Sequence, residues 1–241
     1  MSGNNTISHE ISGIMRDEIL LQRYRSGDRF PSERDLASRF DASRGAVREA
    51  LSHLDQLGLI RSLPGGARVQ PIDSASIGIL GPLMRLKQLP DPELVDQFIQ
   101  TFAAFTSLNI KNAIEKANGA ELIQMKGLVV EMISYSDNFE ALQPSMREFL
   151  ELVSGISGNL VVRLIGNDLK AQFVEAMMQS GIKPNMSESS LRCLFNDLQA
   201  SISRRDSEKA SVAFGKHFEE LRQATRTAIE QASQNSGRKI A

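Results

Sequence analysis

Apolar positions in the first forty residues recur at helical spacing, with polar breaks between them. A first helix is predicted by an apolar stripe at three- and four-residue intervals, formed by Ile7, Ile11, Ile14, Met15 and Ile19. Gly27-Asp28 should end this helix. Ser32 then has the side chain of an N-cap, with Asp35 in the capping-box position, and predicts a second, short helix through Phe40.

The following residues change from helical spacing to strand-like spacing. Ser43 is a second N-cap candidate, and the helix that it opens should stop at Gly58. The apolar face of this helix is formed by Val47, Leu51, Leu54 and Leu57. Residues 59–62 and 67–70 predict two short strands joined by a turn over 63–66. Three helices and a hairpin within about seventy residues predict a winged helix-turn-helix.

Beyond residue 72 the apolar pattern is helical throughout. Residues 73–90 carry glycine and proline among apolar positions and predict a linker with one short helix, at about 77–87. Six further helices are predicted at 92–117, 120–135, 139–156, 159–180, 187–204 and 206–233. We therefore expect a mainly α fold, with a winged helix-turn-helix over residues 1–72, an antiparallel all-α helical bundle over 91–235 and a flexible tail over 236–241.

Composition narrows the class of protein. The 241 residues are 41% hydrophobic, which predicts a globular chain, and the single cysteine, Cys193, excludes a disulfide framework and a cysteine-based zinc finger. Neither a secretory signal nor an apolar run of about 18 to 20 residues is found, so we expect a soluble cytoplasmic protein with no membrane partner.

The positively charged residues of the N-terminal segment differ in type from those of the remaining chain. The formal net charge is −1, but residues 1–72 contain ten arginines and no lysine, against nine acidic residues. The net charge of this segment is only +1, so binding to nucleic acid would require a local basic face. Exclusive use of arginine favours bidentate contacts with phosphates or guanine edges.

Three runs in this segment carry a resemblance to a known family. They are residues 28–37 (DRFPSERDLA), 43–51 (SRGAVREAL) and 57–61 (LGLIR). Together they closely resemble the DNA-binding domain of GntR-type bacterial transcriptional regulators, over about residues 10–70. The helical remainder is similar to the effector domain of the FadR/FCD subfamily, through Phe149 followed by Ser157-Gly158-Asn159.

Candidate DNA-binding residues cluster at the start of the third helix. Ser43, as its cap, would leave backbone N–H groups facing outward, which is the geometry of a phosphate site. Arg44 and Arg48 are one turn apart and project from one side of the helix, where an inserted helix end would present both to base edges or phosphates. Gly45 lies between them and has no side chain to read a base. Sequence readout should therefore depend on the arginines.

The resemblance adds two further DNA contacts. Arg34 occupies a position where family members contact DNA, and the turn Gly65-Gly66 is similar to the family's minor-groove tip. Structural roles compete with these interpretations, since Arg44 and Arg48 can instead pair with Glu49 or Asp41, and Arg34 with Asp35. The two glycines can also form no more than a hairpin turn, and Ser43 no more than a cap.

Many FCD domains resemble one another in holding a divalent ion with one Asp and three His. Leu150 stands here where the first histidine is expected, and Phe195 stands roughly where the second is. His217 matches the third, but His9 and His53 lie in the DNA-binding half. One imidazole does not make a metal site, so we expect no metal and no other cofactor.

The helical half offers a candidate effector pocket. Phe102, Phe149 and His217 are its candidate lining residues, although phenylalanine at helical spacing more often simply packs in a core. A small organic effector, a hydrophobic one such as a fatty acyl group among them, would suit an apolar cavity there.

These observations predict a ligand-responsive, sequence-specific transcriptional regulator. It should act as a homodimer on a pseudo-palindromic duplex operator, more as a repressor than as an activator by analogy with the family. The alternative is an enzymatic or small-molecule-binding helical bundle whose winged helix contacts protein. No nucleophile motif, phosphate loop or His/Cys/Asp cluster in the sequence supports catalysis, and no catalytic residue is assigned.

Overall fold

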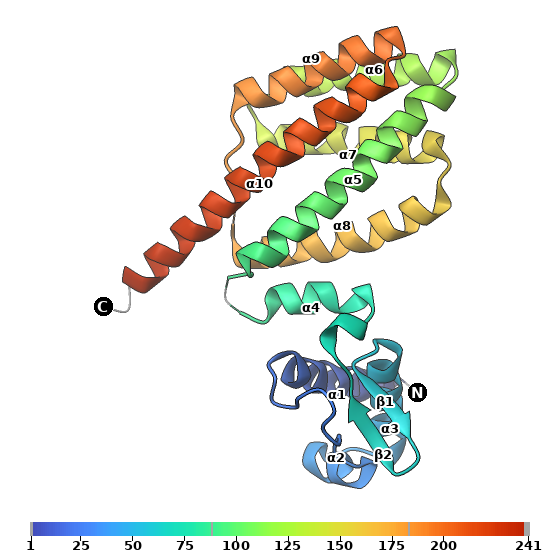
Figure 1. The fold of residues 1–241 in the computed structure, drawn as a ribbon, viewed down its shortest axis with the longest axis vertical. Helices are drawn as coiled ribbons and strands as arrows, with labels where there is room; N and C mark the ends of the chain where they lie inside the picture. The colour runs from blue at the N-terminus through green and yellow to red at the C-terminus, as the bar shows by residue number, and fades with distance from the viewer. Residues whose placement is uncertain (1, 88, 183, 239–241) are drawn as a thin grey trace. The chain divides into compact units, whose positions relative to one another are not determined.

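Two compact units make up the chain: an N-terminal unit, Met1–Gln88, and a helical unit, Leu89–Ala241. The structure is a computed structural model that describes residues 2–87, 89–182 and 184–238 (Figure 1). Helices form most of both units, and the one sheet found among the described residues has two strands. The prediction of a mainly α fold is confirmed.

Helices and a hairpin follow one another in the N-terminal unit in the predicted order. Its first five elements are α1 (Ser2–Leu20), α2 (Glu33–Phe40), α3 (Arg44–Gln56), β1 (Ile60–Leu63) and β2 (Gly66–Val69). The strands are antiparallel and each is displaced by one residue from its predicted range, with Ile60 opposite Val69 and Leu63 opposite Gly66. The core beneath them is formed by buried side chains that include Ile11, Met15, Ile19, Leu36, Val47, Leu54, Ile60 and Val69.

The first helix ends earlier than the sequence predicts. It stops at Leu20 instead of Gly27-Asp28, and Gln22 adopts a left-handed backbone with φ 60°. The chain then pairs with the hairpin, since the amide of Gly27 donates to Val69 O at 2.9 Å and the amide of Phe30 donates to Ala67 O at 2.8 Å. Backbone pairing with a strand some forty residues away therefore takes the place of further helical turns.

A buried carboxylate fixes α1 to α2. Glu18 is 8% exposed, and its two oxygens accept hydrogen bonds from Arg39 at 2.6 and 2.9 Å and from Arg23 at 3.2 Å. The hydrogen bonds from Arg39 hold the pKa of Glu18 below its ordinary value. Two of the ten N-terminal arginines are thus engaged in the fold, which reduces the set available to a polyanion.

The linker contains short helical turns. Two 3-10 turns, Ile72–Ser74 and Ile77–Ile79, precede α4 (Leu80–Arg85). The predicted short helix at about 77–87 therefore exists, but it is divided between a 3-10 turn and six α-helical residues.

Six long helices lie in the described part of the helical unit. They are α5 (Pro92–Lys116), α6 (Gly119–Ser134), α7 (Phe139–Ser157), α8 (Leu160–Ser180), α9 (Glu188–Arg204) and α10 (Ser207–Arg238). Helices α5 and α10 lie side by side (Figure 1) and are joined by a fork-to-fork ion pair, in which Arg222 donates to Asp96 at 2.8 and 2.9 Å. Helix α10 continues three residues into the segment predicted as a tail, and residues 239–241 lie outside the described residues.

No helix of the described chain is both long and apolar enough to cross a membrane.

Candidate nucleic-acid interface and bundle cavity

The N-terminus of α3 is an exposed helix end without acidic side chains. Ser43 has extended backbone angles and its Oγ accepts a hydrogen bond from the amide of Ala46 at 3.2 Å, so the predicted N-cap is confirmed. Arg44 and Gly45 follow it, both exposed, and their amides belong to the first turn, where no intrahelical acceptor exists. The partial positive charge of this helix end is therefore open to an anion such as phosphate.

Gly45 is not required by the fold. A Cβ at this position would meet only Ser43 Oγ, at 3.8 Å, and the backbone is ordinary helix. What its missing side chain provides is open space over the first-turn amides. Beside it, Arg44 is exposed and makes no ion pair with any described residue, so the alternative in which it pairs with Glu49 or Asp41 is wrong for this residue.

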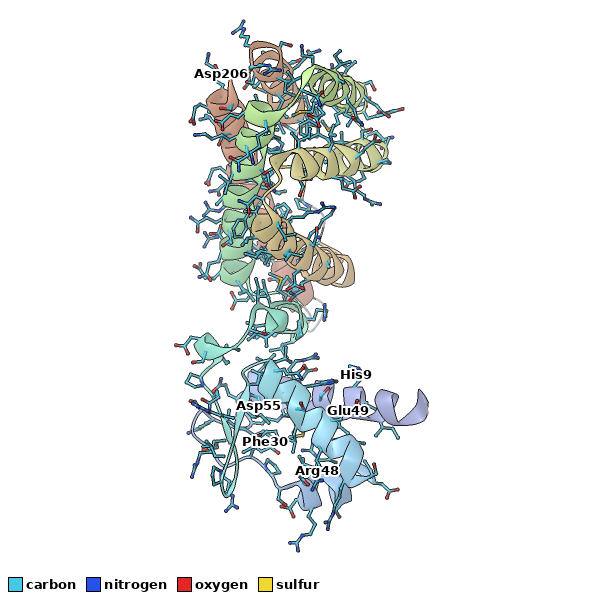
Figure 2. The ribbon with its side chains drawn as sticks, turned by 90° about the vertical axis from the view of Figure 1, so that its right-hand side faces the viewer. His9, Phe30, Arg48, Glu49, Asp55 and Asp206 are labelled. Atoms are coloured by element: carbon cyan, nitrogen blue, oxygen red, sulfur yellow. The ribbon has the colours of Figure 1, made fainter. Side chains whose placement is uncertain are left out.

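Arg48 is paired, but with a residue that the sequence did not suggest. Its Nε donates to both carboxylate oxygens of Glu33 on α2, at 3.0 and 2.9 Å, while 69% of its side chain remains exposed. Figure 2 shows Arg48 near one end of the α3 ribbon and Asp55 near the other. Pairing of Arg48 with Glu49 or Asp41 is therefore wrong, and its outer Nη groups bind no acceptor within the described chain.

Arg34 forms the ion pair with Asp35 that the sequence offered as its structural alternative, but the pair is long and exposed. Its side chain is 83% exposed, and the nearest carboxylate oxygen, on Asp35, lies 3.9 Å away. Asp35 is itself engaged with Ser32, whose Oγ donates to Oδ2 at 2.6 Å and accepts from the amide of Asp35 at 3.3 Å. This hydrogen bond from Ser32 keeps the pKa of Asp35 below its ordinary value. The N-cap half of the expected capping box is thus formed, a bond between the two side chains accompanies it, and the Arg34 side chain stays largely exposed.

The wing turn has the backbone that glycine allows. Gly65 and Gly66 have φ angles of 96° and 121°, and a Cβ on Gly66 would approach Arg29 Nε to 3.4 Å. Arg29 in turn donates from Nη2 to Gly65 O at 2.8 Å, which fixes the turn to the strand-like segment before α2. Both glycines are exposed, and the hairpin-turn role and a role at a DNA groove are compatible.

Three arginines that the sequence did not single out form a row across this wing. Arg61 lies directly opposite Arg68 in the hairpin, and Arg68 is bridged on its other side by Arg29. All three are exposed, and like charges placed directly opposite one another repel. The strand register brings them together, because residues directly opposite one another in a sheet lie on the same face.

The predicted effector residues belong to one row of aromatic rings in the helical unit. Phe102 meets Phe218 edge-on at 5.8 Å, Phe218 stacks near Phe214 at 6.3 Å, and Phe214 stacks on Phe149 at 6.4 Å. His217 touches the same row, 5.7 Å from Phe218. The three residues predicted from the sequence, Phe102, Phe149 and His217, therefore belong to one packed cluster.

A cavity of about 270 Å³ lies between α5, α7 and α8, and of the predicted effector residues only Phe102 lines it. Phe149 is fully buried in the core, and neither it nor His217 lines this cavity. The lining is partly polar and includes residues that the sequence analysis missed: Asn109, Ser154, Arg163, Asn167 and Lys170. Oδ1 of Asn109 is buried without a hydrogen-bond partner in the described chain. The cavity therefore offers an unused acceptor, two cations and one carboxylate, that of Glu151, so its lining has an excess of one positive charge.

These side chains do not fit a divalent metal ion. Leu150 lines the cavity and Phe195 is fully buried, and neither carries a metal-binding atom. His9 and His53 lie in the N-terminal unit, where their rings contact each other at 4.7 Å. Across residues 2–87, 89–182 and 184–238, no three His, Cys, Asp or Glu side chains gather as a metal site would require.

His217 predicts a pH-dependent stability. Burial lowers the pKa of its imidazole from 6.5 to about 4, and its Nδ1 has no hydrogen-bond partner in the described residues. Below pH 6.5 the unfolded chain therefore binds a proton at His217 that the folded chain does not bind. The free energy of unfolding consequently falls as the pH is lowered towards 4. We expect the helical unit to lose about 2 kcal/mol between pH 7.5 and 5, measured by urea unfolding. His217→Phe should remove this loss, and an unchanged pH dependence in that variant would contradict the assignment.

Comparison with known proteins agrees with the geometry of the N-terminal unit. The family described as "Bacterial regulatory proteins, gntR family" matches residues 7–69. A transcriptional repressor of Cronobacter sakazakii, NanR, is 27% identical over 162 residues, which cover 66% of this chain and 62% of the relative. NanR of Escherichia coli O127:H6 is 28% identical over 162 residues, 66% of this chain and 61% of that relative.

The chain thus spans less than two thirds of the length of these curated relatives. A solved structure of Lar, which controls expression of the Listeria monocytogenes agr system, is 16% identical, covers 90% of this chain and 95% of its own, and has a TM-score of 0.53. That likeness concerns the fold. Residues 7–69 are thus similar to the DNA-binding regulators that the gntR family of bacterial regulatory proteins comprises, and the match extends at 27% identity to a NanR repressor.

Proposed function

We propose that the protein is a ligand-responsive transcriptional repressor of the FadR/FCD-like branch, active in the cytoplasm as a homodimer on a pseudo-palindromic operator. The observation that carries this proposal is the exposed, acid-free N-terminus of α3, with Arg44 unpaired and the outer end of Arg48 open within the described chain. A helix end of this kind suits the major groove, where phosphates bind the amides and guanidinium groups reach base edges.

The wing supplies the second part of the interface. The row of Arg29, Arg61 and Arg68 has no carboxylate partner in the described chain, and we assign it to phosphates beside the half-site. Gly65 and Gly66 form the tip that approaches a groove closely. One short helix and one wing give limited affinity, and a two-fold dimer that occupies two half-sites multiplies it.

The cavity between α5, α7 and α8 is the proposed effector site. Phe102, Phe105 and Val153 would contact an apolar part, whereas Arg163 and Lys170 attract an anionic group. Asn109 Oδ1 would accept a hydrogen bond from a ligand hydroxyl or N–H, which its buried and unpartnered state favours. We therefore revise the expected hydrophobic effector to a small organic anion with a donor group, bound without a metal. A ligand that binds one arrangement of the dimer more tightly than another would shift the protein towards that arrangement and so change its affinity for DNA.

DNA binding is tested by fluorescence anisotropy with a duplex from the region upstream of the protein's own gene and with a scrambled duplex of equal length. Affinity for the upstream duplex should exceed that for the scrambled one by about 1000-fold or more. It should fall steeply as salt is raised from 50 to 200 mM, because phosphate contacts release counterions. Equal, salt-insensitive binding to both duplexes would refute the proposal.

A further inference from the structure

We infer that Glu33 is a specificity-determining residue that restricts Arg48 to reading a guanine and prevents it from clamping phosphate. The inference rests on the proposed DNA-binding function and names a role within the same interface. Its structural basis is one contact between neighbouring helices: a single nitrogen of Arg48, Nε, donates to both oxygens of Glu33.

The geometry of this contact separates the two ends of the guanidinium group. Nε lies on the inner side, where the Glu33 carboxylate holds it at 2.9 to 3.0 Å. Nη1 and Nη2 form the outer fork, and they bind no acceptor in the described chain. An arginine normally loses rotamer freedom when it binds a base, but Arg48 is already fixed by its carboxylate partner, so less freedom remains to be lost.

Charge decides which acceptor this fork prefers. The pair of Arg48 and Glu33 has no net charge, so its attraction to a phosphate group is weak, and Glu33 itself is repelled by phosphates. Two N–H donors nevertheless remain in the spacing that matches O6 and N7 of guanine, a neutral pair of acceptors. Arg44, one turn away and without an ion pair to any described residue, keeps its full charge for either acceptor.

Glu33 therefore makes non-specific binding weaker and base discrimination stronger. A carboxylate 39% exposed beside a DNA-reading helix costs affinity on every duplex, since it faces the negative backbone. On the correct sequence that cost is offset by a positioned bidentate contact, which a wrong base pair cannot provide. The structure assigns to one acidic residue on α2 a selective role at the tip of α3.

The test is a double-mutant cycle of Glu33→Gln and Arg48→Ala in the full chain. Each protein is titrated with a duplex selected by the wild type from a random pool, with single G·C-to-A·T variants of it, and with a scrambled duplex. Glu33→Gln should raise affinity for the scrambled duplex about threefold to tenfold and lower discrimination at one G·C pair about tenfold. In the Arg48→Ala background, Glu33→Gln should leave discrimination at that pair unchanged, because the reader is already absent.

Asp35→Asn is the matched control, because it removes one negative charge from the same turn of α2, and the Asp35 carboxylate contacts Ser32 and Arg34 instead of Arg48. It should leave discrimination at that base pair at the wild-type level. Unchanged discrimination in Glu33→Gln, or an equal loss in Asp35→Asn, would overturn the inference while the operator binding of the wild type still stands. A wild-type protein that selects no sequence from the pool would overturn both this inference and the proposed function.

Discussion

Replacing Arg44 and Arg48 together with alanine is expected to lower affinity for the upstream duplex by roughly 100-fold or more. Each well-placed bidentate contact to a base contributes about 1–3 kcal/mol of discrimination, and both guanidinium groups lie at the same exposed helix end. The fold should persist, since the exposed pair of Arg48 with Glu33 contributes no more than about 1 kcal/mol. Anisotropy titrations at one fixed salt concentration measure the loss, and thermal unfolding followed by circular dichroism verifies the fold.

The matched control for that variant removes two positive charges from the helical unit. Arg192 and Arg226 are exposed to a similar degree and each pairs with a glutamate one turn away, at 2.7 and 3.6 Å. Replacement of both with alanine should change DNA affinity less than about threefold, because net charge alone acts weakly at a distance in salt. An equal loss in both double variants would mean that general charge, and not the end of α3, governs binding.

Local chemistry was the part of this interface that could be predicted from the sequence. The caps at Ser32 and Ser43 are decided by hydrogen bonds within three residues, so a residue type followed by an apolar stripe is enough to identify them. The spacing of Arg44 and Arg48 is likewise fixed by the helix itself. Helical periodicity alone therefore puts both arginines on the exposed face of α3, where they lie.

Partners that are distant in sequence could not be predicted in this way. Glu33 lies fifteen residues before Arg48 and meets it only because α2 packs beside α3. Similarly, the sequence predicts that Gly27-Asp28 ends α1, whereas residues 27–30 pair with β2 and the helix ends at Leu20. In each case a tertiary contact decides the outcome, and periodicity contains no information about that contact.

The cavity illustrates a different limit. An apolar stripe shows which residues are buried, but a ligand site requires polar groups that converge from several helices. Arg163, Asn167 and Lys170 do follow helical spacing along α8, which was an available signal for a shared polar face. That signal could not show that this face turns towards Asn109 on α5 and encloses a cavity with it.

Phe149→Ala is expected to destabilise the helical unit by about 3–5 kcal/mol, the usual cost of removing a buried phenylalanine. Its side chain is 0% exposed and stacks on Phe214, so no solvent or ligand can fill the space that alanine would leave. Phe149→Leu keeps most of the volume and should cost less than about 2 kcal/mol. Phe102→Ala should cost less than Phe149→Ala, because Phe102 is only partly buried and borders an existing cavity.

Urea unfolding of the three variants, followed by circular dichroism at pH 7.5, separates a core role from a ligand-lining role. A large loss confined to Phe149→Ala identifies Phe149 as core, as its burial indicates. A loss below about 1 kcal/mol would instead mean that the ring occupies space which water or a ligand can take, and Phe149 would return to the effector site that its sequence position first suggested. Because the row of rings joins α7 to α10 through Phe214, the same measurement also reports how strongly these helices are held together.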